Sequence, residues 1–110
     1  MHPSTFLSRV DTGTQPLAAG VARTFDLEVN GATNWTLLIA NVGANPITAG
    51  TIAYSPLGGR FTDPEALPAG LPLAAGATTP VVGQNRPVAT VRLVLTSSAG
   101  TDVVIEGGGR

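Results

Sequence analysis

The chain has 110 residues, a formal net charge of −1 at pH 7 and only 12% charged residues, and all six of its cations are arginines. A chain of this length fits one domain. Its near-zero charge argues against nucleic acid as a partner, because phosphate binding relies on clustered basic groups. Without cysteine and with one histidine, His2, the sequence lacks the groups for a disulfide, a thiolate metal site or a histidine-based catalytic pair.

Glycine and proline divide the chain into short segments of strand length. The 14 glycines and 9 prolines recur with the spacing of turns between short strands, and helical periodicity is absent. We expect seven strands, near Thr5–Val10, Ala22–Val29, Trp35–Val42, Ile47–Tyr54, Thr78–Val82, Val88–Thr96 and Asp102–Glu106. The chain is therefore expected to be all-β.

Two of these segments show the alternation of a strand with one buried and one wet face. In Ala22–Val29 every second residue from Phe25 to Val29 is apolar, and the residues between them are polar. Val88–Thr96 alternates in the same way, except that Val94 falls on the outer face. An apolar residue on the outer face is a candidate for contact with another subunit.

The segment Trp35–Val42 differs, because it is apolar on both faces around Leu38. Either it is a central strand, or its outer face meets a neighbouring subunit, and the sequence leaves both interpretations open. Trp35 begins the segment, where a tryptophan serves as a core or interface anchor.

The residues from Ser55 to Pro72 form an excursion longer than an ordinary hairpin loop. Asp63–Leu67 could form one helical turn within it, with Asp63 as the N-cap. Long loops of this kind often carry binding functions. Phe61 is either an interface anchor or part of a lid that closes one end of the domain. The anchor candidates in and beside the excursion are Tyr54, Arg60, Phe61 and Leu67.

The two halves of the chain resemble each other. The pentapeptide Pro-Leu-Ala-Ala-Gly stands at Pro16–Gly20 and again at Pro72–Gly76, 56 residues later, and the same offset superposes several apolar strands. Recurrence through biased composition is the alternative. We predict a two-layer antiparallel β-sandwich or jelly-roll-like barrel of about seven to eight strands, with two related halves as one option.

The sequence offers little for catalysis, and we expect neither an enzyme nor a cofactor or metal. Asp26 and Glu28 share the wet face of one strand, where carboxylates confer solubility. Gly58-Gly59-Arg60 lacks the pattern of a phosphate-binding loop. No apolar run reaches the length of a transmembrane helix, and the N-terminal residues have no signal-peptide pattern. We expect Met1–Val10 or Glu106–Arg110 to reach onto a neighbouring subunit as an arm.

Three stretches together carry a resemblance to known proteins: Asn41–Ile47 between two strands, Leu71–Thr78, and the late strand Val91–Ser97. In layout the chain resembles small all-β virion proteins of tailed bacteriophages, of the capsid decoration or cement type. The turn at Asn41–Ile47 is also similar to that of jelly-roll subunits of extracellular fibres, which often lock together through cysteines. The first resemblance implies a virion component, assembled in the host cytoplasm, that packs against a capsid or other virion protein.

We therefore expect a non-enzymatic structural protein whose partners are itself, as a homo-oligomer, and a virion protein, with no nucleic acid and no membrane. The alternative is a ligand-binding or adhesion sandwich, with a glycan held by Trp35, Tyr54 or the excursion, or a fibre subunit. The expected interface residues are Trp35, Leu38, Tyr54, Arg60, Phe61, Leu67 and Val94.

Overall fold

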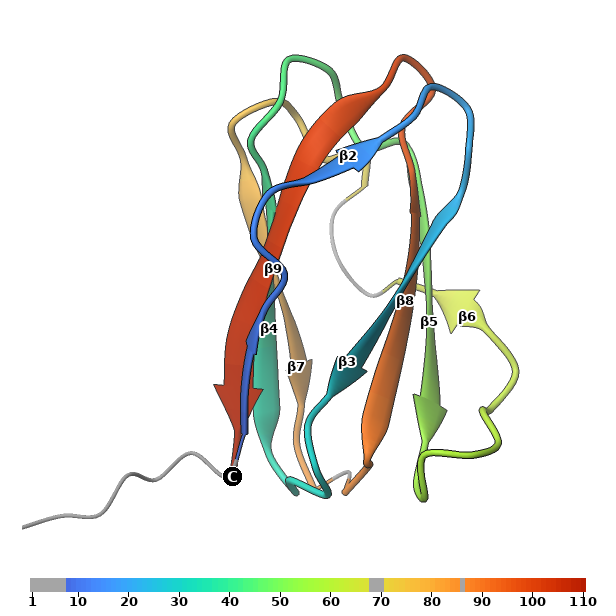
Figure 1. Ribbon diagram of the computed structural model, residues 1–110, viewed down its shortest axis with the longest axis vertical. Coiled ribbons are helices and arrows are strands. Elements are labelled where there is room, and N and C mark those ends of the chain that lie inside the picture. The colour runs from blue at the N-terminus through green and yellow to red at the C-terminus, as the bar shows by residue number, and fades with distance from the viewer. Residues whose placement is uncertain (1–7, 68–70, 86) are drawn as a thin grey trace, which may run out of the picture.

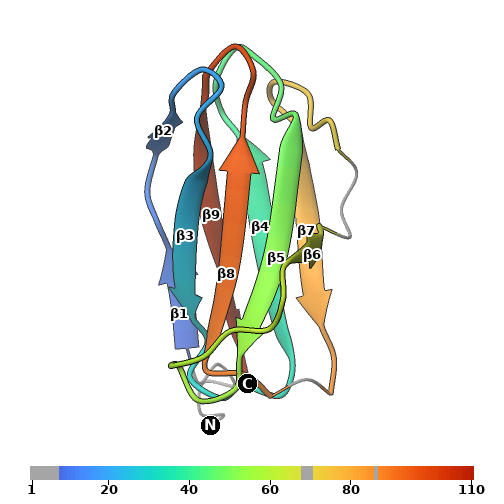
Figure 2. The same cartoon turned by 90° about the vertical axis from the view of Figure 1, so that its right-hand side faces the viewer.

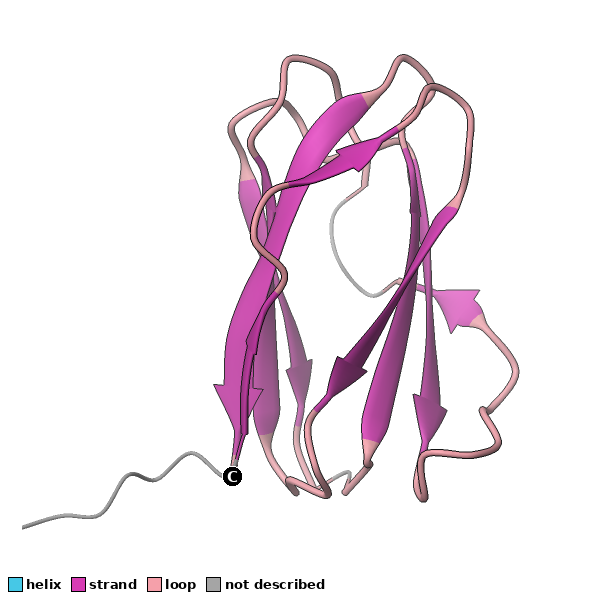
Figure 3. Ribbon diagram, in the orientation of Figure 1, coloured by secondary structure: helices cyan, strands magenta, loops and turns pink. Residues whose placement is uncertain are grey.

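The computed structural model describes residues 8–67, 71–85 and 87–110, and over these ranges it shows nine strands and no helix. Two antiparallel sheets face each other as a β-sandwich (Figure 1, Figure 3). Sheet A has the order β1 (Ser8–Asp11), β9 (Thr101–Gly109), β4 (Trp35–Asn41) and β7 (Thr78–Gly83), with β2 (Gln15–Leu17) also paired to β9. Sheet B has the order β3 (Arg23–Glu28), β8 (Thr90–Thr96), β5 (Ala49–Ser55) and β6 (Glu65–Ala66). The predicted all-β sandwich is confirmed.

The core lies between the sheets and follows from the two-residue period of the strands. In β4 the side chains alternate between buried and exposed, and in β8 the buried side chains alternate with half-buried ones from Val91 onward. The largest fully buried apolar side chains are Leu37, Ile39, Ile47, Ile52, Leu93, Leu95 and Ile105. Both central strands therefore contribute to one continuous core.

Each of the seven predicted strands is present, with shifted ends, and two short strands were missed. The first predicted strand is seen from Ser8 onward, because residues 1–7 lie outside the described residues, as does most of the proposed N-terminal arm. The helical turn expected at Asp63–Leu67 is wrong. Glu65 and Ala66 instead form β6, which pairs with Ile52 and Thr51 of β5.

The two halves of the chain are structural equivalents. The order β1-β9-β4-β7 in sheet A corresponds to β6-β5-β8-β3 in sheet B, so each half contributes strands to both sheets. The register agrees at the predicted offset: Trp35 pairs with Gly83 in sheet A, and Val91 pairs with Leu27 in sheet B, 56 residues away in each case. Leu38 and Val94 are thus equivalent outward residues on the two central strands.

The turns follow the same relationship. The amide of Gly76 donates to the carbonyl of Asn41 (2.8 Å), and the amide of Gly20 donates to the carbonyl of Ser97 (2.9 Å). Both glycines have a positive φ, of 80° and 71°, a conformation that side chains with a Cβ rarely adopt. The repeated Pro-Leu-Ala-Ala-Gly therefore marks two equivalent turns.

One difference separates the halves. The equivalence shifts by one residue at β5 and β9, because Leu37 pairs with Gly107 whereas its counterpart Leu93 pairs with Ile52. The predicted register without a gap is therefore wrong by one residue at this strand.

The glycine-rich end of the chain is held inside sheet A. Strand β9 continues to Gly109 and lies between β1 and β4, so the expectation that Glu106–Arg110 reaches onto a neighbour is wrong for its backbone. A Cβ on Gly107 would collide with the carbonyl oxygen of Thr36 and lie 3.0 Å from the Cα of Leu37. Glycine is thus required here because two backbones approach closely.

Candidate protein interface

The outer face of sheet A is apolar over its two middle strands and the edge strand β7. Leu38 on β4 is 37% exposed, and Val82 on β7 is 53% exposed. Pro80 lies between them as the register partner of Leu38. The outward apolar residues, which we name the sheet A patch, are Leu38, Ala40, Val42, Pro80, Val82 and Val104.

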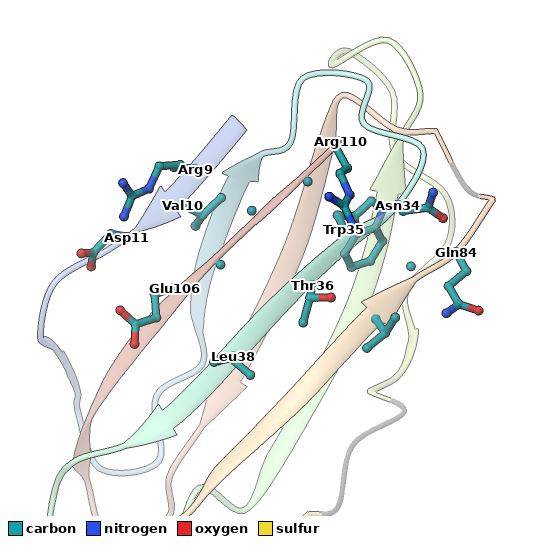
Figure 4. A pocket seen from close by; sticks show the side chains of 15 residues that line it. Arg9, Val10, Asp11, Asn34, Trp35, Thr36, Leu38, Gln84, Glu106 and Arg110 are labelled. Carbon is teal, nitrogen blue, oxygen red and sulfur yellow. The ribbon is translucent and has the colours of Figure 1, made fainter. Parts of the chain in front are cut away.

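A groove of about 830 Å³ lies at the lower end of this face (Figure 4). Its floor includes the backbone of Gly107–Gly109, where the absence of side chains leaves the surface hollow. Leu38 and Val82 line it on one side, and Arg9 of β1 lies on the other. The patch therefore continues into a depression that could receive side chains of another surface.

Charged side chains border the patch on the β1 side only. Arg9 and Asp11 project from β1, and Glu106 lies beside them on β9 (Figure 4). None of them forms an ion pair within the described ranges, although a carboxylate oxygen of Asp11 accepts a hydrogen bond from the amide of Gly13 (2.9 Å). The border thus carries both signs of charge, available to a partner.

The outer face of sheet B is covered by the chain itself. Figure 2 shows the segment between β5 and β6 running across the front of β8 and β5. The amide of Thr62 donates to the carbonyl of Tyr54 (2.8 Å), and the Tyr54 amide donates to the Thr62 hydroxyl (3.0 Å). Ala53 and Ser55 are buried as a result, with 3% and 0% of their surface exposed. The equivalent surface of sheet A has no such cover among the described residues.

An ion pair supports this cover. The guanidinium of Arg92 donates to both carboxylate oxygens of Asp26 (2.7 and 3.0 Å) across the sheet, and it stacks on the ring of Phe61, 3.8 Å from the centroid. The hydrogen bonds from Arg92 hold the pKa of Asp26 below its ordinary value of 3.8, against a smaller opposing effect of burial. Phe61 is therefore neither a free anchor nor a lid on the end of the sandwich, but packs on its side.

Three of the expected interface residues lie in the core. Trp35 is 2% exposed and Leu67 is 6% exposed. Tyr54 is half-buried, with its ring 6.0 Å from that of Trp35. Gly83 leaves room for the indole, because a Cβ there would overlap its ring. These side chains stabilise the sandwich and are not presented to a partner.

The remaining candidates lie on different surfaces. Leu38 is in the sheet A patch, whereas Val94 is half-buried on sheet B and Arg60 is exposed on the excursion. Sequence reasoning missed Val82 and Leu57, of which Leu57 is 93% exposed. A leucine placed between Pro56 and two glycines cannot join a strand, and this signal could have identified Leu57.

The described residues contain no group of three or more histidine, cysteine, aspartate or glutamate side chains placed to hold a metal ion. The same part of the chain has no helix with the length and hydropathy needed to span a membrane. A scan against protein-family models and a search of curated proteins find no match for this chain.

Proposed function

We propose that the protein is a non-enzymatic structural subunit that packs against other protein surfaces through the sheet A patch. The observation that carries this proposal is an exposed sheet face built from apolar and uncharged residues in a chain with only 12% charged residues. Contiguous apolar surface of this kind is typical of a protein contact, because water solvates it poorly. The cover over the equivalent face of sheet B supports the same function, since it shows how this fold shields such a surface.

The proposed setting is a phage virion, as a capsid decoration or stabilising protein assembled in the host cytoplasm. It rests on the resemblance of Asn41–Ile47 and Val91–Ser97 to tailed-phage virion proteins. In a shell, many weak contacts act together, so a modest interface on each copy is sufficient for stable attachment. The protein itself and another virion protein are the proposed partners.

A ligand-binding or adhesion function is the second candidate. Asn34, Gln84 and Arg110 line one end of the groove, and such side chains hydrogen bond to polar ligands. However, none of the aromatic side chains that the structure describes is exposed as a stacking platform. The groove therefore fits a protein surface better than a glycan.

Sedimentation velocity up to millimolar concentration tests the proposal with two equivalent substitutions, Leu38→Asp on sheet A and Val94→Asp on sheet B. We expect the wild type to associate, Leu38→Asp to remain monomeric with an unchanged melting temperature, and Val94→Asp to associate. A monomeric wild type contradicts the proposal. Loss of association in Val94→Asp alone contradicts it as well, because the contact would then lie on sheet B.

A further inference from the structure

We infer that the occupant of the sheet A patch is a second copy of this chain, placed face to face with its strands antiparallel to those of the first. The inference rests on the proposed function and adds the partner and the arrangement. It is carried by the placement of the unpaired charges that border the patch.

The outward residues of sheet A form rows across the strands. The row nearest the lower end of the sheet contains Arg9, Gly108, Thr36 and Val82, and the next row contains Asp11, Glu106, Leu38 and Pro80. Opposite charges thus occupy neighbouring rows of the same strand, β1.

A two-fold axis between these rows, lying in the interface and perpendicular to the strands, exchanges one row with the other. Arg9 of each copy then faces Asp11 of the other, which gives two equivalent ion pairs. Glu106 of one copy faces the bare backbone at Gly108 of the other, beside Arg110. The same operation places Leu38 against the apolar middle of the facing sheet.

The alternative two-fold axis, parallel to the strands, does not satisfy the charges. It would place the β1 border of one copy against the β7 border of the other, where Thr78, Pro80 and Val82 carry no charge. Arg9 and Asp11 would lose water without gaining a partner, which costs free energy. The perpendicular axis also leaves the two sheets aligned, as in other face-to-face sheet packings.

The contact is expected to be weak. Four strands about 4.8 Å apart and seven residues of about 3.3 Å cover roughly 400 Å². A standard interface buries about 800 Å² per partner. Association should therefore be measured at high concentration, and in an assembly it would act together with other contacts.

The experiment reverses each charge separately. The Arg9→Asp chain has two carboxylates on β1 and the Asp11→Arg chain has two guanidiniums, so each is expected to self-associate on the order of tenfold more weakly than the wild type. An equimolar mixture of the two variants restores association, because every facing pair is then opposite in charge. The double variant Arg9→Asp/Asp11→Arg restores it within one chain.

Sedimentation velocity with one variant fluorescently labelled measures the mixture, and thermal melts show that both exposed substitutions leave the fold intact. If Leu38→Asp abolishes association but the charge reversals do not change it, or if the mixture stays monomeric, this arrangement is wrong while the proposed function stands. If the wild type itself does not associate, both are wrong.

A second measurement is independent of charge. Because the chain has no cysteine, Thr36→Cys and Leu38→Cys can be introduced in separate chains and joined with a short bismaleimide. The perpendicular axis brings these positions together between copies, so the mixed cross-link is expected to form faster than one between Thr36→Cys and Val104→Cys. Equal rates would overturn the arrangement.

Discussion

The ring of Phe61 lies against the guanidinium of Arg92, with the Cζ atom 3.8 Å from the ring centroid. This contact joins the excursion between β5 and β6 to the middle of sheet B. Since Arg92 also binds Asp26 on β3, one side chain connects the excursion, β8 and β3. The contact explains why one face of the sandwich is covered while the other is open.

Removing the Phe61 ring is expected to loosen this cover. Phe61→Ala should lower the free energy of unfolding by about 1–2 kcal/mol, less than the 3–5 kcal/mol of a fully buried phenylalanine, because the ring is only half-buried. Leu57→Ala is the control, since Leu57 is 93% exposed and its truncation should leave stability unchanged. Urea unfolding measures both. Equal losses in the two variants would contradict the packing of Phe61.

The ion pair between Asp26 and Arg92 is expected to make stability depend on pH. The pKa of Asp26 is lowered in the folded state, so its contribution is present above the ordinary value of 3.8 and is lost as the pH falls through the folded value. Asp26→Asn should therefore be less stable than the wild type at pH 7, and this difference should vanish near pH 2.

The difference at pH 7 is expected to be small and to shrink in high salt, because both side chains are more than a third exposed. Urea midpoints at the two pH values, with and without salt, measure it. A difference that persists unchanged at low pH would mean that the Asp26 side chain acts through packing rather than charge.

Gly107 should not tolerate a side chain. Gly107→Ala places a methyl group against the backbone of Thr36 and Leu37 in β4, where neither strand can move without breaking the sheet. We expect a loss of about 2–3 kcal/mol, the cost of overpacking a tight site. Gly59→Ala is the matched control, because a Cβ there meets nothing within 4 Å. If both variants unfold at the wild-type urea concentration, β9 does not lie against β4 as described.

Asn41 is expected to be the most sensitive polar residue of the core. Its side-chain amide donates to the carbonyls of Asn45 (2.8 Å) and Leu73 (3.0 Å), and its oxygen accepts from the Thr101 hydroxyl (2.8 Å). Asn41→Ala leaves these groups without a partner in a buried site, at a cost of about 2–4 kcal/mol. The exposed Asn34→Ala should cost far less. Thermal unfolding compares them, and equal melting temperatures would contradict this role.

The sequence by itself determined the class of fold and the inner faces of its strands. Alternation has a period of two along a strand, so Phe25 and Leu27 could be assigned to the core without knowledge of any neighbour. The repeated Pro-Leu-Ala-Ala-Gly likewise identified two equivalent turns, because the glycine conformation they need is a local property.

The tertiary structure alone decided which outer face is open. Leu38 and Val94 look alike in the sequence, as apolar residues on the outer side of a central strand. They differ because the excursion folds over sheet B and not over sheet A, and that choice depends on a contact between Phe61 and Arg92, which lie 31 residues apart (92 − 61). Non-local contacts of this kind leave no periodic signal.

The same reason explains the pairing of the glycine tail and the charged border. Strand β9 holds Gly107–Gly109 because β1, from the other end of the chain, and β4 supply partners on both sides. Arg9 and Glu106 are neighbours only through this pairing, so the sequence could not have placed them together. Local patterning therefore specified the two layers, and long-range pairing decided which surface they present.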